Sequence, residues 1–136
     1  MRPDPTRERP LLQIVDDCVE QRDLYEMALE QDFEIVTATR GVDAIALAVA
    51  KQPDAIVLDL RMPGMGGLEV CRYLKRDPVT ADIPVVVLTG DDDRRLQLEA
   101  LTAGAAAVLT KPCSPPRLIG TLRAAVDRST GLHRFK

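Results

Sequence analysis

The segment AIVLDLRMPGMGG, residues 55–67, carries the clearest information about the fold of this chain. It begins with a short run of apolar side chains, and such a run is typical of a strand that is buried on both faces of a sheet. The run ends at Asp59, and a proline and three glycines follow it. These residues predict a loop with unusual backbone freedom. We therefore expect a buried strand that delivers one carboxylate to an open loop.

Three other short apolar runs also end on reactive polar groups. The first ends at Asp16 and Asp17, the second at Thr89 and the third at Lys111. Helical stretches separate the runs, so we interpret the runs as parallel strands. Because the carboxyl ends of parallel strands lie at one edge of a sheet, we expect these groups to meet Asp59 there.

Five predicted strands alternate with five predicted helices. The strands are expected at residues 11–15, 33–38, 54–60, 83–88 and 107–110, and the helices at 19–31, 42–51, 68–76, from the acids 91–93 to 103, and at 115–127. This alternation predicts an α/β fold, namely a single doubly wound, three-layer domain with a five-stranded parallel sheet. We choose the strand order 2-1-3-4-5, because its switch point brings the acids of the first and third strands side by side. The second strand then lies at the sheet edge.

The folded domain is expected to span residues 10–128. The polar, proline-containing residues 1–9 predict a disordered tail, and residues 129–136 predict a second tail or the start of a linker. A length of 136 residues leaves no room for another folded domain, since domains most often contain about 100–150 residues.

Composition and charge argue against several kinds of protein. The net charge of −3 and the absence of tryptophan, with only two Phe and two Tyr, disfavour direct binding to nucleic acid. The charge also disfavours anionic membranes, and no apolar stretch approaches the roughly 20 residues of a membrane span. Three widely spaced cysteines form neither a zinc pattern nor a disulfide framework. We therefore expect a soluble protein of the reducing cytoplasm.

The three carboxylates at the predicted sheet edge would repel one another unless a cation lay between them. Mg²⁺, or Mn²⁺ in its place, is a hard cation that prefers oxygen ligands, and Mg²⁺ often shares its site with phosphate. The metal and Lys111 together would balance the negative charge of the carboxylates. Such a site suits phosphoryl transfer, in which aspartate is a known nucleophile. Asp59 is the best candidate, because it ends the central strand beneath an open loop.

Each of these residues has a simpler interpretation when it is taken alone. Asp16 or Asp17 alone would most often cap a helix. Thr89 alone would be a turn residue, and Lys111 alone would be a solvated loop charge. Their expected meeting with Asp59 at one sheet edge favours a functional site.

Four motifs carry a resemblance to a known family: IVDD at residues 14–17, IVLDLRMPG at 56–64, VVVLTG at 85–90 and LTKP at 109–112. With these motifs the chain resembles a response-regulator receiver domain of two-component signal transduction, over residues 10–128. The resemblance implies a flavodoxin-like receiver fold that works as a phosphorylation-dependent switch. Asp59 would accept a phosphoryl group from a sensor histidine kinase or a histidine phosphotransfer protein. The switch would then regulate a downstream protein or an output domain outside this chain, and the sequence leaves open whether it forms a homodimer.

The resemblance also implies a set of metal ligands. Asp17, Asp59 and the backbone carbonyl of Arg61 would bind Mg²⁺, and Asp16 would act largely through water. Asp59 would thus be both a ligand and the phosphoacceptor.

Two further residues would contact the phosphoryl group. Lys111 would pair with Asp59 or with a phosphoryl oxygen, and a cis peptide bond before Pro112 would aim the lysine inward. Thr89 would move toward the phosphoryl group and report its presence.

The chain departs from the family pattern at two positions. Family members often carry Tyr or Phe three residues before the lysine, where this chain has Val108, so signalling through the face of the fourth helix, fifth strand and last helix is expected to be altered. Gly66 stands where the common loop has an aspartate. Arg61 and Asp91 flank the approach of water in this family and should tune the lifetime of the phosphoryl group.

Two other kinds of function remain open. An aspartate-nucleophile phosphatase usually has a second aspartate two residues after the nucleophile, where this chain has Arg61. An interaction module that is never phosphorylated would not need the retained carboxylates, Thr89 and Lys111. No G-x-G-x-x-G motif follows the first strand, which argues against dinucleotide binding. We expect a switch that catalyses only its own phosphorylation and dephosphorylation and is not otherwise an enzyme.

Overall fold

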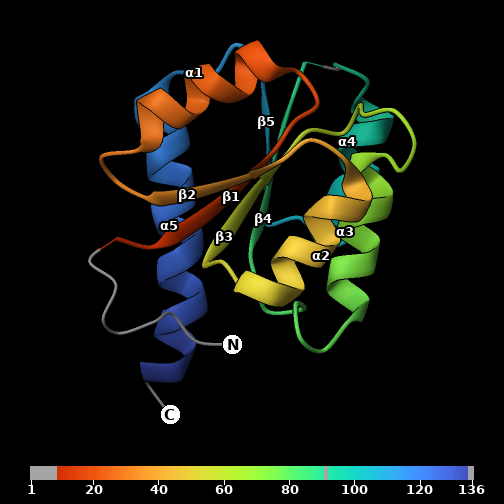
Figure 1. Cartoon of the computed structure of the whole chain (residues 1–136). Coiled ribbons are helices and arrows are strands. Elements are labelled where there is room, and N and C mark those ends of the chain that lie inside the picture. Colours follow the sequence, from red (N-terminus) through yellow and green to blue (C-terminus); the bar gives the residue numbers. More distant parts are fainter. Residues whose placement is uncertain (1–8, 91, 135–136) are drawn as a thin grey trace.

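The computed structural model describes residues 9–90 and 92–134, with side chains described as far as residue 129. These residues form five strands and five helices in alternation (Figure 1). In chain order the elements are β1 (Leu11–Val15), α1 (Val19–Leu29), β2 (Glu34–Ala38), α2 (Gly41–Lys51), β3 (Ala55–Leu58), α3 (Gly67–Arg76), β4 (Val85–Thr89), α4 (Arg94–Thr102), β5 (Ala107–Thr110) and α5 (Pro115–Arg134). Except for Arg9, the predicted amino-terminal tail lies outside the described residues.

The sheet has the predicted strand order. β2, β1, β3, β4 and β5 lie side by side in that order, and each neighbouring pair is parallel. Val15 lies opposite Leu58, and Leu58 lies opposite Val87. The amide of Asp59 donates to the carbonyl of Val15 over 3.1 Å. The backbone is therefore held by the ladder at the point where Asp16 and Asp59 leave the sheet.

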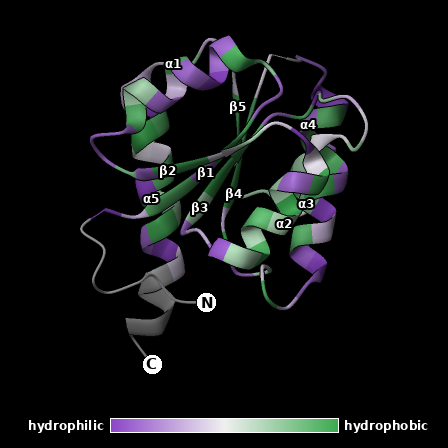
Figure 2. Cartoon of the chain, viewed as in Figure 1, coloured by the Kyte–Doolittle hydropathy of each residue, from purple (hydrophilic) through white to green (hydrophobic). Residues whose placement is uncertain are grey.

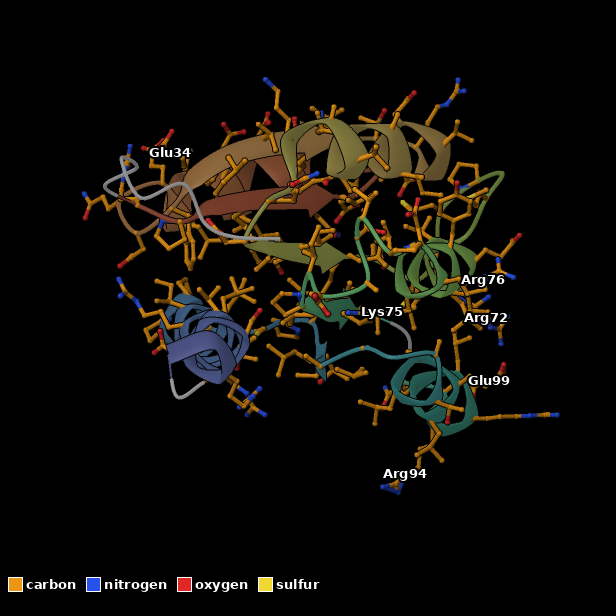
Figure 3. All side chains as sticks on the ribbon, turned by 90° about the horizontal axis from the view of Figure 1, so that it is seen from below. Glu34, Arg72, Lys75, Arg76, Arg94 and Glu99 are labelled. Atoms are coloured by element: carbon orange, nitrogen blue, oxygen red, sulfur yellow. The ribbon has the colours of Figure 1, made fainter. Side chains whose placement is uncertain are left out.

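The helices lie in two layers, one on each face of the sheet. α1 and α5 cover one face, and α2, α3 and α4 cover the other (Figure 1); seen from below, α5 lies on the opposite side of the sheet from α3 and α4 (Figure 3). The strands are largely hydrophobic (Figure 2), and the side chains of β1, β3 and β4 are all buried. Because helices cover both faces, the central strands have no face in water, which explains their continuous rather than alternating apolar runs. The doubly wound, three-layer α/β fold is confirmed.

The loop after β3 is held by an unusually close approach of α3. A Cβ atom on Gly67, the first residue of α3, would lie 2.1 Å from the carbonyl oxygen of Asp59 and 2.8 Å from the α carbon of Leu60. The amide of Gly67 donates to the carbonyl of Leu60 over 3.0 Å. Only a residue without Cβ fits this position. α3 therefore fixes the backbone that carries the Asp59 side chain.

Three strands are shorter than the sequence predicts: β2 lacks its first predicted residue, β3 is shorter at both ends and β4 begins later. β3 ends directly before Asp59, because Asp59 and Leu60 already belong to the loop that meets α3. β4 begins at Val85, two residues later than predicted. Pro84 has no amide hydrogen to donate to a ladder, and the amide of Ile83 donates to the carbonyl of Thr80 over 3.0 Å instead.

The last helix is longer than expected. The sequence predicts an end near Asp127, but α5 continues to Arg134. No proline follows Pro116, so nothing forces the helix to end, and the one glycine after Asp127 is tolerated in its interior. Whether residues 129–136 lead into a linker stays a prediction. Neither α5 nor any other helix among the described residues is long and apolar enough to cross a membrane.

Candidate functional site

The residues predicted for the site meet in one pocket at the carboxyl edge of the sheet. The pocket has a volume of about 380 Å³. A water molecule takes up roughly 30 Å³, so a hydrated ion and a small anion would fit there together. The pocket is lined by Asp16, Asp17, Cys18, Gln21, Asp59, Arg61, Thr89, Gly90 and Lys111.

The three carboxylates lie close enough together to bind one metal ion. One oxygen from each of Asp16, Asp17 and Asp59 lies within 4.8 Å of the others. Asp16 and Asp59 are buried, with 4% and 9% of their surface exposed, whereas Asp17 is exposed. Burial keeps water from screening the repulsion between Asp16 and Asp59. A cluster of carboxylate oxygens fits a hard divalent cation such as Mg²⁺.

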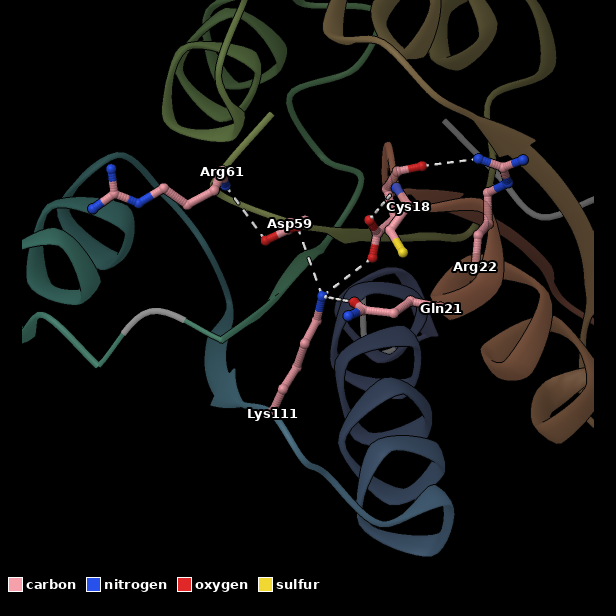
Figure 4. Close-up of polar contacts among 7 residues, drawn as sticks. Cys18, Gln21, Arg22, Asp59, Arg61 and Lys111 are labelled. Atoms are coloured by element: carbon pink, nitrogen blue, oxygen red, sulfur yellow. Dashed lines mark hydrogen bonds and ion pairs between the residues drawn. The ribbon is translucent and has the colours of Figure 1, made fainter. Parts of the chain in front are cut away.

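Lys111 lies between the two buried carboxylates. Its Nζ is 3.2 Å from Oδ2 of Asp16 and 3.7 Å from Oδ2 of Asp59 (Figure 4). Nζ also donates to Oε1 of Gln21. The shorter of the two ion pairs is thus the one with Asp16, whereas the resemblance implied a pair with Asp59 or with a phosphoryl oxygen. The Lys111–Pro112 peptide bond is cis, as the resemblance implied.

Asp16 is held through both of its carboxylate oxygens. Oδ1 accepts the amide of Cys18 over 2.9 Å, and Oδ2 accepts from Lys111. Arg22 donates to the backbone carbonyl of Asp16 over 3.0 Å (Figure 4). Cys18 is the N-cap residue of α1, so Asp16 closes the turn before the helix rather than capping it, and it also faces the pocket. Each oxygen of a carboxylate can accept more than one partner, so Asp16 can also take part in binding a metal.

Asp59 carries a carboxylate in an unfavourable electrostatic environment. Burial raises its pKa above the ordinary value, and the charges of Asp16 and Asp17 raise it further. Lys111 and the amide of Arg61 oppose this rise in pKa, and the amide nitrogen lies 3.4 Å from Oδ1. The charged form of Asp59 is thus incompletely compensated by the protein, and a bound cation would favour it.

We expect this environment to make the stability of the protein depend on pH when divalent cations are absent. Because the folded-state pKa of Asp59 is raised above its ordinary value of 3.8, the folded protein binds more protons than the unfolded chain between the two values. The free energy of unfolding should therefore fall as the pH rises through this window, and the full penalty should be present above it. Urea unfolding in EDTA at a series of pH values measures the effect.

The Asp59→Asn variant isolates this effect from the titration of the other acids. It should be more stable than the wild type at neutral pH, and the difference should shrink as the pH falls toward the ordinary aspartate pKa. A difference in stability that does not change with pH would show that Asp59 is not destabilised in its charged form.

The other predicted residues occupy the following places. Thr89 ends β4, is fully buried and lines the pocket, and the exposed Arg61 lines it from the loop after β3. Val108 is half-buried in β5 and packs against the core beneath α2, α3 and α4. Gly66 is the N-cap of α3. Asp91 lies outside the described residues.

Three residues that line the pocket, Cys18, Gln21 and Gly90, were not among the predicted site residues, and Gln21 is the one that contacts a predicted residue through its side chain. Gln21 lines the pocket and accepts a hydrogen bond from Lys111, which is 90 positions away in the chain. The available signal was its spacing: Gln21 stands four residues after Asp17, and this spacing is about one turn of the helix that begins at the site.

An acidic pocket with a lysine at the carboxyl edge of a doubly wound sheet defines a class of signalling domain. Residues 12–123 match the response regulator receiver domain. The chain therefore belongs to the response regulator receiver domain family, and it has the flavodoxin-like fold of that family. Receiver domains act in two-component signalling, where their general function is to accept a phosphoryl group. They bind Mg²⁺ at an acidic pocket, and most of them are switches rather than enzymes.

Relatives with known names include proteins of very different length. The chain is 38% identical over 117 residues to the phosphate regulon transcriptional regulatory protein PhoB of Pseudomonas aeruginosa, covering 85% of this chain and 51% of PhoB. It is 42% identical over 124 residues to the response regulator PleD of Caulobacter vibrioides, covering 90% of this chain and 26% of PleD. It is 33% identical over 114 residues to protein PilH of Pseudomonas aeruginosa, covering 83% of this chain and 94% of PilH. The chain thus spans about half of PhoB, a quarter of PleD and nearly all of PilH.

Solved structures agree with this assignment. The signal receiver domain of a signal transduction histidine kinase from Syntrophus aciditrophicus superposes with a TM-score of 0.81 at 30% identity, covering 88% of this chain and 91% of that one. The chemotaxis protein CheY4 of Vibrio cholerae superposes with a TM-score of 0.80 at 28% identity, covering 86% of this chain and 98% of that one.

Proposed function

We propose that Asp59 is the phosphoacceptor of this receiver domain and that a histidine kinase or a histidine phosphotransfer protein is the donor. The observation that carries the proposal is the cluster of three carboxylate oxygens within 4.8 Å of one another, with the Lys111 ammonium beside it. Asp59 directly follows the central strand β3 and begins the loop that leads to α3, and its side chain lines the pocket. An incoming phosphoryl group would therefore find the Asp59 carboxylate beside the metal ligands and the Lys111 ammonium.

The donor set fits Mg²⁺, with Mn²⁺ as a substitute. Asp17, Asp59 and the backbone carbonyl of Arg61 would bind the ion, and Asp16 would act largely through water while it stays bonded to Cys18 and Lys111. When bound, Mg²⁺ would neutralise negative charge on the carboxylates and on the phosphoryl oxygens. The raised pKa of Asp59 supports this assignment, since it shows that the protein alone compensates the carboxylate only in part.

The transfer is a direct displacement at phosphorus. An oxygen of the ionised Asp59 carboxylate forms a bond to phosphorus while the phosphorus–nitrogen bond of a phosphohistidine breaks, and the imidazole nitrogen keeps the electron pair. No proton has to leave Asp59, because the carboxylate attacks in its charged form. Lys111 lies 3.7 Å from Oδ2 of Asp59, so its ammonium is within reach of a phosphoryl oxygen there.

Phosphorylation would then change the charge at one point of the sheet edge. A phosphate group carries about 1.5 to 2 negative charges near neutral pH, where the carboxylate carried one. We expect the buried Thr89 hydroxyl to contact the added oxygens, and Arg61 and Asp91 to control how readily water removes them. Val108 has no ring to rotate, so the change would reach the surface by a route other than an aromatic side chain.

The relatives indicate only the general kind of output and partner that this domain has. PhoB and PleD extend well beyond the matched region, whereas PilH does not. We therefore propose that the phosphorylated domain regulates either an attached output domain or a separate protein, in the cytoplasm and without binding nucleic acid itself. Dimer formation stays a prediction.

Phosphorylation should be visible as a change in intact mass. After incubation with Mg²⁺ and acetyl phosphate, the wild type is expected to gain one phosphoryl group. The same incubation with EDTA should slow the gain by about tenfold or more, because the carboxylates would then repel the incoming anion.

Two results would contradict the proposal. The wild type could gain no phosphoryl group from acetyl phosphate or from phosphorylated kinases, although circular dichroism shows that it is folded. Alternatively, the gain could proceed at the same rate with and without divalent cations, in which case the acidic cluster would not be a metal site. Multiple turnover of an external phosphoester would instead identify a phosphatase.

A further inference from the structure

The Lys111 ammonium makes two hydrogen bonds in this structure, and both hold it on the side of α1. It donates to Oδ2 of Asp16 over 3.2 Å and to Oε1 of Gln21 (Figure 4). Oδ2 of Asp59 lies 3.7 Å away, which is an ion pair but too long for a hydrogen bond. When the ammonium turns toward a phosphoryl group on Asp59, one of its two hydrogen bonds is therefore expected to loosen.

The three oxygens around the ammonium differ in how strongly they hold it. The side chains of Asp16 and Asp59 are 6% and 12% exposed, and both are carboxylates. Gln21 is exposed and uncharged. A hydrogen bond to a buried carboxylate is stronger than one to a neutral amide in contact with water. Gln21 is thus the acceptor that an incoming anion displaces most easily.

Gln21 is also placed by the same element that places Asp16. It stands in the first turns of α1, and the amide of Cys18, at the start of this helix, donates to Oδ1 of Asp16 over 2.9 Å. Asp16 and Gln21 therefore present their oxygens to Lys111 from one continuous segment, the turn after β1 and the start of α1, whereas Asp59 comes from the loop after β3. The lysine is drawn toward α1, which agrees with its shorter contact to Asp16 than to Asp59.

We propose that Gln21 is a positioning residue that holds one donor of Lys111 until a phosphoryl oxygen takes its place. The inference rests on Asp59 being the phosphoacceptor. In the unphosphorylated domain, the Lys111 ammonium stays hydrogen-bonded and close to the acids. On phosphorylation, the amide oxygen returns to water and the ammonium turns to the new anion. Because the amide is neutral and exposed, this exchange of partners involves no separation of buried opposite charges.

Substitutions at Gln21 should change the rate of phosphorylation in opposite directions. The hydrogen bond to Gln21 stabilises the ground state and is absent from the transition state, so its removal lowers the barrier. Gln21→Met keeps the length and helix preference of the side chain but removes the acceptor, and phosphorylation by acetyl phosphate should become about threefold to tenfold faster. Gln21→Glu adds a carboxylate that binds Lys111 more firmly and repels the phosphodonor, and the rate should fall by about tenfold or more.

The control is Gln31→Glu, which makes the same change of charge just after α1, at the end remote from the pocket. Its phosphorylation rate should equal that of the wild type. Nuclear magnetic resonance tests directly whether Gln21 releases Lys111 on phosphorylation. The side-chain amide signals of Gln21 should shift to the positions of a freely solvated amide when the wild type is phosphorylated, and they should stay in place if Gln21 only stabilises the fold. Thermal unfolding of all variants shows whether they are folded.

The outcomes separate this inference from the function on which it rests. If the wild type is phosphorylated on Asp59 but Gln21→Met and Gln21→Glu react at the wild-type rate, the role proposed for Gln21 is wrong and the assignment of Asp59 as the phosphoacceptor stands. A slower Gln21→Met would also overturn the inference, because it would mean that Gln21 orients Lys111 for transfer. If the wild type is not phosphorylated at all, both proposals are wrong.

Discussion

Asp59→Asn is expected to lose phosphorylation by acetyl phosphate by about a thousandfold or more, since the carboxylate oxygen is the nucleophile and an amide cannot replace it. The substitution keeps the shape of the side chain, so the effect is chemical rather than structural. The remaining acids, Asp16 and Asp17, lie within 4.8 Å but belong to the segment after β1. Neither is expected to take over, because Asp16 is committed to Cys18 and Lys111, and Asp17 is exposed. Intact mass measured over time gives the rate for each protein.

The matched control for this prediction is Asp82→Asn, which removes one exposed carboxylate away from the pocket. It should be phosphorylated at the wild-type rate. Equal adduct formation by Asp59→Asn and the wild type would mean that the phosphoryl group is carried by another residue.

Gly67→Ala is expected to lower the free energy of unfolding by about 3 kcal/mol or more, a large value for overpacking. A Cβ atom at this position would lie 2.1 Å from the carbonyl oxygen of Asp59 and 2.8 Å from the α carbon of Leu60. Both neighbours are backbone atoms, so no side chain can turn aside to make room. The chain would have to move α3 away from the loop after β3. A loss of this size should lower the melting temperature by about 10 °C.

Gly120→Ala provides the control, since an added Cβ atom there meets no atom within 4 Å. This glycine lies inside α5, where alanine should stabilise the helix by about 0.5–1 kcal/mol. The close approach of α3 to Asp59 would be refuted by a Gly67→Ala protein that melts within about 2 °C of the wild type.

The sequence allowed most of the fold to be predicted because each local signal agrees with the others. Four apolar runs each end on a site residue, and the right-handed crossover rule leaves few ways to connect parallel strands. The order of the strands then follows from bringing the acids of the first and third strands together. Element ends were less predictable, since they depend on single backbone groups such as the missing amide hydrogen of Pro84.

The site could be predicted as a set of residues but not as a network of contacts. Asp16, Asp17, Asp59, Thr89 and Lys111 were expected in one pocket and do line it together. The preference of Lys111 for Asp16 over Asp59, and its hydrogen bond to Gln21, depend on the paths of side chains that are far apart in sequence. The spacing of Gln21 from Asp17 places it near the site, but it does not determine which oxygen Lys111 contacts.

The position of the phosphoryl group decides whether Asp59 is the phosphoacceptor. Wild-type protein incubated with Mg²⁺ and acetyl phosphate can be reduced with borohydride, which converts an aspartyl phosphate to homoserine, and then digested and sequenced by tandem mass spectrometry. We expect homoserine at position 59 and unchanged aspartate at positions 16 and 17. Unchanged Asp59 in a protein that has gained one phosphoryl group would contradict the assignment of Asp59 as the phosphoacceptor.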